Sequence, residues 1–157
     1  ESLSIDITEH ISCREKEIKH LNAFFLQISK TKQNQFIYVS GCPGTGKTLV
    51  VKNLISKFQK KISSYFINCM NINTPNDFFH ALLSKVNKST QSSDPLKDLE
   101  KWMELKKQNK RILFVFDEVD RVSNYTIKIF NPIFRLLFQS KFVFSVLAIS
   151  NSSNFAS

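Results

Sequence analysis

The three glycines of this 157-residue chain lie together in one short loop, at Gly41, Gly44 and Gly46. With Lys47 and Thr48 they complete the spacing G-x-x-x-x-G-K-[ST], which is the pattern of a loop that binds phosphate. Such a loop turns its backbone N–H groups inward, which requires positive φ angles and a close backbone approach that a Cβ would block. The chain is therefore expected to place this loop between a strand and a helix.

The residues on either side of the loop meet that requirement. Phe36 to Ser40 reads as a buried strand, and apolar residues recur at helical spacing from Leu49 to Phe58. The N-terminus of this helix directs free N–H groups and the helix dipole at the phosphates. Lys47 then supplies a mobile cation, and the Thr48 hydroxyl supplies a ligand for Mg²⁺. The expected nucleotide contacts are Gly41, Cys42, Pro43, Gly44, Thr45, Gly46, Lys47, Thr48 and Leu49.

A second informative stretch ends in the acids Asp117 and Glu118. The apolar run from Ile112 to Phe116 leads straight into them, which indicates a strand buried on both faces with carboxylates at its C-terminal end. In an open α/β sheet, ligands bind at that edge. We expect Asp117 to hold the Mg²⁺ shell and Glu118 to polarise the water that attacks the γ-phosphate. Asp120 and Arg121 are expected to be surface or capping residues.

The remaining elements follow from apolar spacing and turn residues. The expected helices cover 14–30, a segment that starts at Pro75 with Thr74 as N-cap, a segment that starts at Pro95, and 124–139, where Pro132 bends or breaks the helix. The apolar face of the first helix includes Ile18, and that of the last helix includes Ile127 and Phe138. The helix after the glycine loop should end near Ile62, and the other strands should cover 65–69 and 142–149.

Asn151 follows the last expected strand and has two interpretations. A polar side chain beside the phosphate loop can hydrogen-bond the γ-phosphate or the attacking water. An asparagine after a strand is also common in a turn.

Composition limits the class of protein. The net charge of +9 suits a polyanionic partner, either the nucleotide or a nucleic acid. The three cysteines lack a CxxC spacing, so neither a disulfide framework nor a zinc site is indicated. Secretory and membrane-spanning patterns are absent from the sequence, and the chain is expected to be soluble, intracellular and without a membrane partner.

Taken together, these motifs resemble the AAA+ ATPase domain of the eukaryotic and archaeal origin-licensing ATPases. That family includes cell division control protein six and the large subunit of the origin recognition complex. The resemblance rests on Arg14-Glu15-Lys16-Glu17, on the glycine loop, on Asn68-Cys69-Met70 with Thr74-Pro75, on Asp117-Glu118-Val119-Asp120 and on Ala148-Ile149-Ser150-Asn151. It covers almost the whole chain.

The resemblance implies a P-loop NTPase fold, a three-layer α/β sandwich with a parallel sheet. It implies ATP and Mg²⁺ as ligands, Ile11 near the adenine, Arg14 in the opening motif of the domain and Asn151 as the sensor of the γ-phosphate. The implied activity is ATP hydrolysis, weak without a partner subunit, in a switch for origin licensing and helicase loading in the nucleus. The implied partners are other AAA+ subunits of the origin recognition complex, the replicative helicase and DNA.

The resemblance also implies parts that have no counterpart in residues 1–157, which we expect to form a single, incomplete core. These are a fifth strand, an arginine finger, a helical lid and a winged helix. We therefore expect a fragment, with Phe36 to Ser40 at an unpaired edge of the sheet. Three alternatives stay open: a docking scaffold that binds ATP without turnover, a clamp loader and a small-molecule P-loop kinase.

Overall fold

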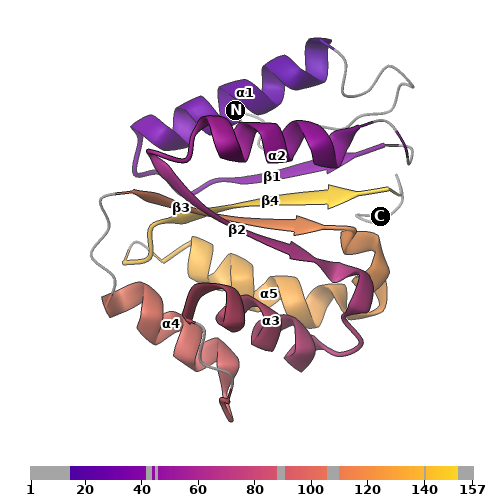
Figure 1. Ribbon diagram of the computed structural model, residues 1–157. Coiled ribbons are helices and arrows are strands. Elements are labelled where there is room, and N and C mark those ends of the chain that lie inside the picture. The colour runs from indigo at the N-terminus through magenta and orange to yellow at the C-terminus, as the bar shows by residue number, and fades with distance from the viewer. Residues whose placement is uncertain are drawn as a thin grey trace.

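A four-stranded parallel sheet runs through the centre of the molecule in the order β1-β4-β3-β2 (Figure 1). Its strands are β1 (Phe36–Ser40), β2 (Ile62–Asn68), β3 (Arg111–Asp117) and β4 (Phe144–Ser150). The computed structural model describes residues 15–41, 44, 46–87, 91–105, 110–139 and 141–151. Within this described part, β1 and β2 are the edge strands, so the expectation that Phe36 to Ser40 lies at an edge is confirmed.

Helices cover both faces of the sheet, as Figure 1 shows. One face carries α1 (Glu15–Lys30) and α2 (Lys47–Lys57), and the other carries α3 (Pro75–Asn87), α4 (Pro95–Leu105) and α5 (Thr126–Leu137). Two short 3-10 helices, η1 (Cys69–Asn71) and η2 (Val119–Tyr125), follow β2 and β3. This is the three-layer sandwich that the resemblance implied, and none of the described helices is long and apolar enough to span a membrane.

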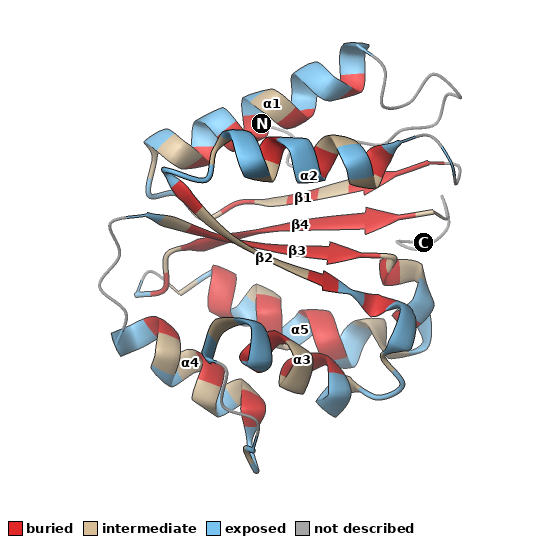
Figure 2. Cartoon of the chain, in the orientation of Figure 1, coloured by how far each residue is buried: buried red, intermediate tan, exposed pale blue. Residues whose placement is uncertain are grey.

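The central position of β3 in the sheet explains why its sequence is an unbroken apolar run. Ile112, Phe114 and Phe116 pack against the helices α3, α4 and α5, whereas Leu113 and Val115 pack under α1 and α2. Alternate side chains of a strand point to opposite faces, so a strand covered on both sides must be apolar at every position. Figure 2 shows the result as a sheet interior that is buried almost throughout.

The capping residues of α3 and α4 explain where these helices begin. The Asp77 N–H donates to Thr74 Oγ1 over 3.0 Å, so the predicted N-cap of α3 is confirmed. The Lys97 N–H donates to Asp94 Oδ1 over 3.2 Å at the start of α4. Each contact satisfies one of the backbone donors that the first turn of a helix leaves free.

The second strand was predicted with the wrong boundaries. It begins at Ile62, which pairs with Arg111, and ends at Asn68, which pairs with Asp117. The serines that follow Ile62 weaken the apolar pattern, but an edge strand accepts them because they are only half-buried. Cys69, expected in the strand, starts the helix η1, and α2 ends at Lys57 instead of near Ile62.

The last helix and the last strand also differ from expectation. The helix α5 is not broken at Pro132, and it starts at Thr126 because η2 occupies the preceding residues. Ile127 and Phe138, expected on its apolar face, are 71% and 87% exposed, and Ile18 on α1 is 39% exposed. These residues lie near helix ends, where a periodic pattern in the sequence extends past the turns that the sheet covers.

Asn34 explains why β4 starts at Phe144 rather than at Phe142. Its side-chain amide donates to the carbonyls of Leu137 and Phe142 over 2.8 and 2.7 Å. Its Oδ1 accepts from the Phe144 N–H over 3.0 Å. One side chain therefore satisfies three backbone groups in the connection between α5 and β4, which would otherwise lack partners.

Candidate nucleotide-binding site

The glycine loop leaves the sheet at the C-terminal end of β1 and leads into α2. Gly44 and Gly46 have φ angles of 79° and 85°, a region that glycine occupies without steric cost. A Cβ built on either residue would meet no atom within 4 Å. Within the chain itself, it is therefore the backbone conformation, and not a lack of space, that requires glycine at these two positions.

Lys47 is the first residue of α2, and its side chain is buried beneath the loop. The residue is 3% exposed, and its Nζ donates to the Gly41 carbonyl over 3.2 Å. Burial of an ammonium group is costly unless polar or anionic groups surround it. A buried cation beside the residue that begins the loop is suited to an anionic ligand.

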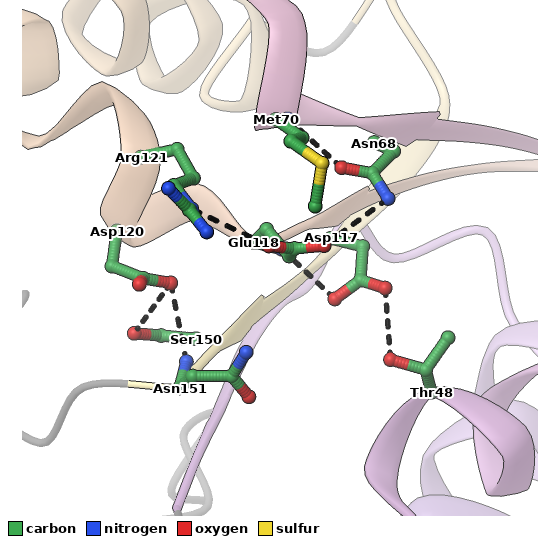
Figure 3. Close-up of polar contacts among 9 residues, drawn as sticks. All are labelled: Thr48, Asn68, Met70, Asp117, Glu118, Asp120, Arg121, Ser150 and Asn151. Carbon is green, nitrogen blue, oxygen red and sulfur yellow. Dashed lines mark hydrogen bonds and ion pairs between the residues drawn. The ribbon is translucent and has the colours of Figure 1, made fainter. Parts of the chain in front are cut away.

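Thr48 and Asp117 meet directly, although 69 positions separate them in the chain. The Thr48 hydroxyl donates to Asp117 Oδ2 over 2.8 Å, and the Glu118 N–H donates to Asp117 Oδ1 over 2.8 Å (Figure 3). Asp117 is 4% exposed, and this burial raises the pKa of its carboxyl, while the two hydrogen bonds lower it in part. A buried carboxylate with a raised pKa is stabilised by a nearby cation.

The donor set at this position suits Mg²⁺. This ion takes one or two protein oxygens and completes its shell with water and phosphate, and Thr48 and Asp117 provide a hydroxyl and a carboxylate side by side. In the described residues, no group of three or more His, Cys, Asp or Glu side chains gathers into a metal site. Thr48 and Asp117 supply two oxygens, so a metal bound there would need phosphate and water to complete its shell.

Glu118 has an unusual backbone conformation, and its side-chain carboxylate is contacted by residues from two elements. Its φ of 56° and ψ of 44° lie in the left-handed region, which costs a residue with a Cβ about 1–3 kcal/mol. The Asn68 amide donates to Glu118 Oε2 over 3.3 Å, and Arg121 Nε lies 3.5 Å from Oε1. The carboxylate is thereby oriented at the end of β3, one residue beyond Asp117.

The sequence did not predict the roles of Asn68 and Arg121. Asn68 stands opposite Asp117 in the register of β2 and β3, and its Oδ1 also accepts from the Met70 N–H over 2.8 Å. A polar residue at the end of a strand beside the acidic one was a signal that could have identified it. Arg121, expected at the surface, is 56% exposed but reaches Glu118 through one turn of η2.

Asp120 was likewise expected to be a surface or capping residue; it is half-buried, and its carboxylate makes contacts that this expectation did not include. Its Oδ1 accepts from the Asn151 N–H over 3.1 Å and from the Ser150 hydroxyl over 3.4 Å. Asn151 itself follows β4, whose residue Ser150 pairs with Ser40 just before the glycine loop. The register therefore brings Asn151 to the edge of the sheet where Gly41 begins the loop.

Cys69 is buried close to the acids at this edge. The pKa of this thiol is raised to about 12, mainly by burial and then by the negative charges of Asp117, Glu118 and Asp120. The thiol therefore stays protonated at neutral pH. Three carboxylates, those of Asp117, Glu118 and Asp120, lie at this end of the sheet (Figure 3).

Some predicted contacts lie outside the described residues. These are Cys42, Pro43 and Thr45 in the loop, and Ile11 and Arg14 ahead of α1. Leu49 is described and is 64% exposed in the first turn of α2. The structure thus brings together Gly41, Lys47, Thr48, Asp117, Glu118 and Asn151 at the C-terminal edge of the sheet.

Comparison with known proteins identifies relatives of this chain. The AAA domain family matches residues 30–153. Over 161 aligned residues the chain is 31% identical to origin recognition complex subunit 1 of Plasmodium falciparum, which covers 93% of this chain and 13% of that protein. It is 26% identical to the human cell division control protein 6 homolog over 129 residues, 78% of this chain and 23% of that protein. The chain therefore spans less than a quarter of these relatives.

A solved structure of the Drosophila origin recognition complex bound to DNA contains a chain of the same fold. The TM-score is 0.78 at 23% identity, and the match covers 96% of this chain and 41% of that one. The family match over residues 30–153 includes the glycine loop and all four strands of the sheet. The chain belongs to the AAA domain family, and the relatives compared here are origin recognition complex and cell division control proteins.

Proposed function

We propose that this chain is the nucleotide-binding core of a DNA replication initiation ATPase, a module that binds and hydrolyses ATP during origin licensing. The hydrogen bond between Thr48 and Asp117 carries the proposal, because it joins the glycine loop to the acidic strand end in one site. A phosphate loop without such an acid would only bind an anion. The likeness to origin recognition complex subunit 1 and to cell division control protein 6 supports the biological role.

The residues of the site have different roles in binding and hydrolysis. Backbone N–H groups of the loop and Lys47 hold the phosphates, and Thr48 with Asp117 would hold Mg²⁺. A bound Mg²⁺ neutralises charge on the phosphate oxygens. Glu118 orients a water for in-line attack on the γ-phosphorus and accepts its proton at a carboxylate oxygen, while the bond from that phosphorus to the bridging oxygen breaks and ADP leaves. Asn151 contacts the γ-phosphate from the end of β4.

The contacts to Glu118 favour turnover over a silent docking role. A residue that served only to bind nucleotide would not need its carboxylate oriented by Asn68 from β2 and by Arg121 from η2. Such support by neighbouring side chains is typical of groups whose position decides a reaction rate. We infer that the site is an ATPase whose rate depends on how Glu118 is held.

The proposed setting of this activity is a complex on DNA in the nucleus. Other AAA+ subunits of an origin recognition complex would complete the site, and the replicative helicase would be the downstream partner. The net charge of +9 supports a polyanionic partner, and the Drosophila complex of similar fold is bound to DNA. Without a partner subunit, turnover by this chain should be slow.

Glu118→Gln tests the enzymatic part of the proposal, because it keeps the size of the side chain and removes the proton acceptor. We expect unchanged ATP affinity and at least about a hundredfold loss of single-turnover hydrolysis rate. Asp77→Ala, which removes an exposed carboxylate on α3, is the control and should leave both quantities unchanged. Equal hydrolysis by Glu118→Gln and the parent chain would remove Glu118 from this role.

A further inference from the structure

We propose that Asp120 is a positioning residue that ties the end of β4 to the turn carrying Glu118, so that Asn151 faces the terminal phosphate. This inference rests on the proposed function for the identity of the ligand. The connection of Asp120 to Ser150 and Asn151, which we call the tie, rests only on contacts within the chain. Asp120 acts through Asn151 and needs no contact with nucleotide.

The carboxylate of Asp120 bridges two consecutive residues of another element. Its Oδ1 accepts from the Asn151 N–H over 3.1 Å and from the Ser150 hydroxyl over 3.4 Å (Figure 3). Ser150 is the last residue of β4 to pair with β1. A backbone N–H just beyond the last ladder position needs another acceptor, and a carboxylate makes a stronger hydrogen bond than a neutral group does.

The turn that holds Asp120 also determines the conformation of Glu118. The helix η2 starts after Glu118 in its left-handed conformation, and the Arg121 N–H donates to the Glu118 carbonyl over 3.0 Å. Val119 and Val122 anchor this turn because both are fully buried. A displacement of the turn would therefore move Glu118 and Asp120 together, and through Asp120 it would move the backbone of Asn151.

This arrangement differs from an ordinary helix cap. The N-cap of η2 is Glu118, and it makes no side-chain capping bond. The described hydrogen bonds of the Asp120 carboxylate go instead to Ser150, the last residue of β4, and to Asn151, which follows it. Through these bonds, the turn that follows Glu118 is connected to the residue pair Ser150 and Asn151.

The tie can be measured without any nucleotide, by NMR hydrogen exchange of the Asn151 backbone amide. Asp120→Ala should raise the exchange rate of that amide about tenfold or more, while Val115 in β3 keeps its protection. Asp120→Asn retains an acceptor oxygen and should stay closer to the parent. If Asp120→Ala fails to fold, Asp120→Glu displaces the carboxylate by one methylene and should raise the rate as well. An unchanged rate in the variant that folds overturns the tie.

A second readout tests the orientation of Asn151 toward the terminal phosphate. Asp120→Ala should lower the ratio of ATP to ADP affinity about fivefold or more, with little change in ADP affinity. Asn151→Ala should do the same, and the double variant should lose no more than Asn151→Ala alone, because both act through one group. Asp77→Ala serves as the control for loss of a carboxylate.

The outcomes separate the two proposals. Faster exchange with an unchanged affinity ratio contradicts the orientation of Asn151, because the tie would then exist without serving the phosphate. Additive losses in the double variant contradict an action through Asn151. A folded parent that binds neither nucleotide overturns the proposed function and the orientation together, while the exchange rates still decide whether the tie exists.

Discussion

The hydroxyl of Thr48 lies 2.8 Å from Oδ2 of Asp117, so the first turn of α2 and the end of β3 share a hydrogen bond. These two residues come from the two motifs that the sequence set apart, and parallel pairing in the sheet brings them together. Their contact is the simplest structural argument that the two motifs form one site. It also places a hydroxyl and a carboxylate where a phosphate-bound metal would need them.

Asp117→Asn should separate nucleotide binding from metal binding. The amide oxygen can still accept from the Glu118 N–H and the amide NH₂ can donate to the Thr48 hydroxyl, but the side chain lacks the charge that attracts Mg²⁺. We expect the affinity for ATP with Mg²⁺ to fall about tenfold, toward the value that the parent shows in chelator. Titration calorimetry of both proteins with and without Mg²⁺ measures this, with Asp98→Asn on α4 as the control. A full Mg²⁺ effect in Asp117→Asn would contradict the assignment.

The same substitution should change the dependence of stability on pH. Burial raises the pKa of Asp117 above its usual value of 3.8. The folded chain therefore binds this proton more tightly than the unfolded chain does. The resulting stability is present below the usual pKa and is lost as the pH rises through the raised pKa.

Without ligand, Asp117→Asn should therefore be at least as stable as the parent at neutral pH. Its advantage should shrink as the pH falls. Urea unfolding from about pH 3 to about pH 7 can be followed by the fluorescence of Trp102, the single tryptophan, which packs edge-on against Tyr65 at 5.7 Å. A parent that gains stability over Asp117→Asn with rising pH would show the opposite sign.

Asn34→Ala should destabilise the fold although Asn34 is far from the site. The change removes three hydrogen bonds and leaves the carbonyls of Leu137 and Phe142 without this donor. We expect a loss of about 1–3 kcal/mol in the free energy of unfolding, measured by urea at neutral pH. Gln33→Ala, an exposed neighbour, should cost less than about 0.5 kcal/mol. Similar losses for the two variants would contradict the role of Asn34.

Much of the fold could be predicted because its signals are local. The glycine loop and the apolar run of β3 have compositions that few other structures require. The ends of β2 and α5 could not be predicted in this way. Pairing with β3 extends β2 back to Ile62, and α5 begins only at Thr126 because η2 occupies the residues before it. Periodicity describes which residues are apolar, but it does not say how far the sheet extends to cover them.

The residues of the site that stand at motif positions could be predicted from the sequence. The residues that hold other site residues in position could not. Lys47, Thr48, Asp117 and Glu118 stand at motif positions, and the structure gathers them. Asp120 and Asn68 hold the site through bonds to residues of other elements, and Arg121 contacts Glu118 within its own turn. Single polar residues of this kind carry no periodic signal, and only the register of the strands shows which partners they reach.

The most direct test of the account is the calorimetric affinity of the chain for ATP with Mg²⁺, compared between the parent and Lys47→Ala. Lys57→Ala, an exposed lysine in the last turn of the same helix, is the matched control. The account predicts that the parent and Lys57→Ala bind ATP alike, whereas Lys47→Ala weakens binding at least about tenfold because the phosphates lose their buried cation. A folded parent that binds no ATP, or a Lys47→Ala variant that binds as the parent does, would contradict the claim that this loop and strand end form a nucleotide site.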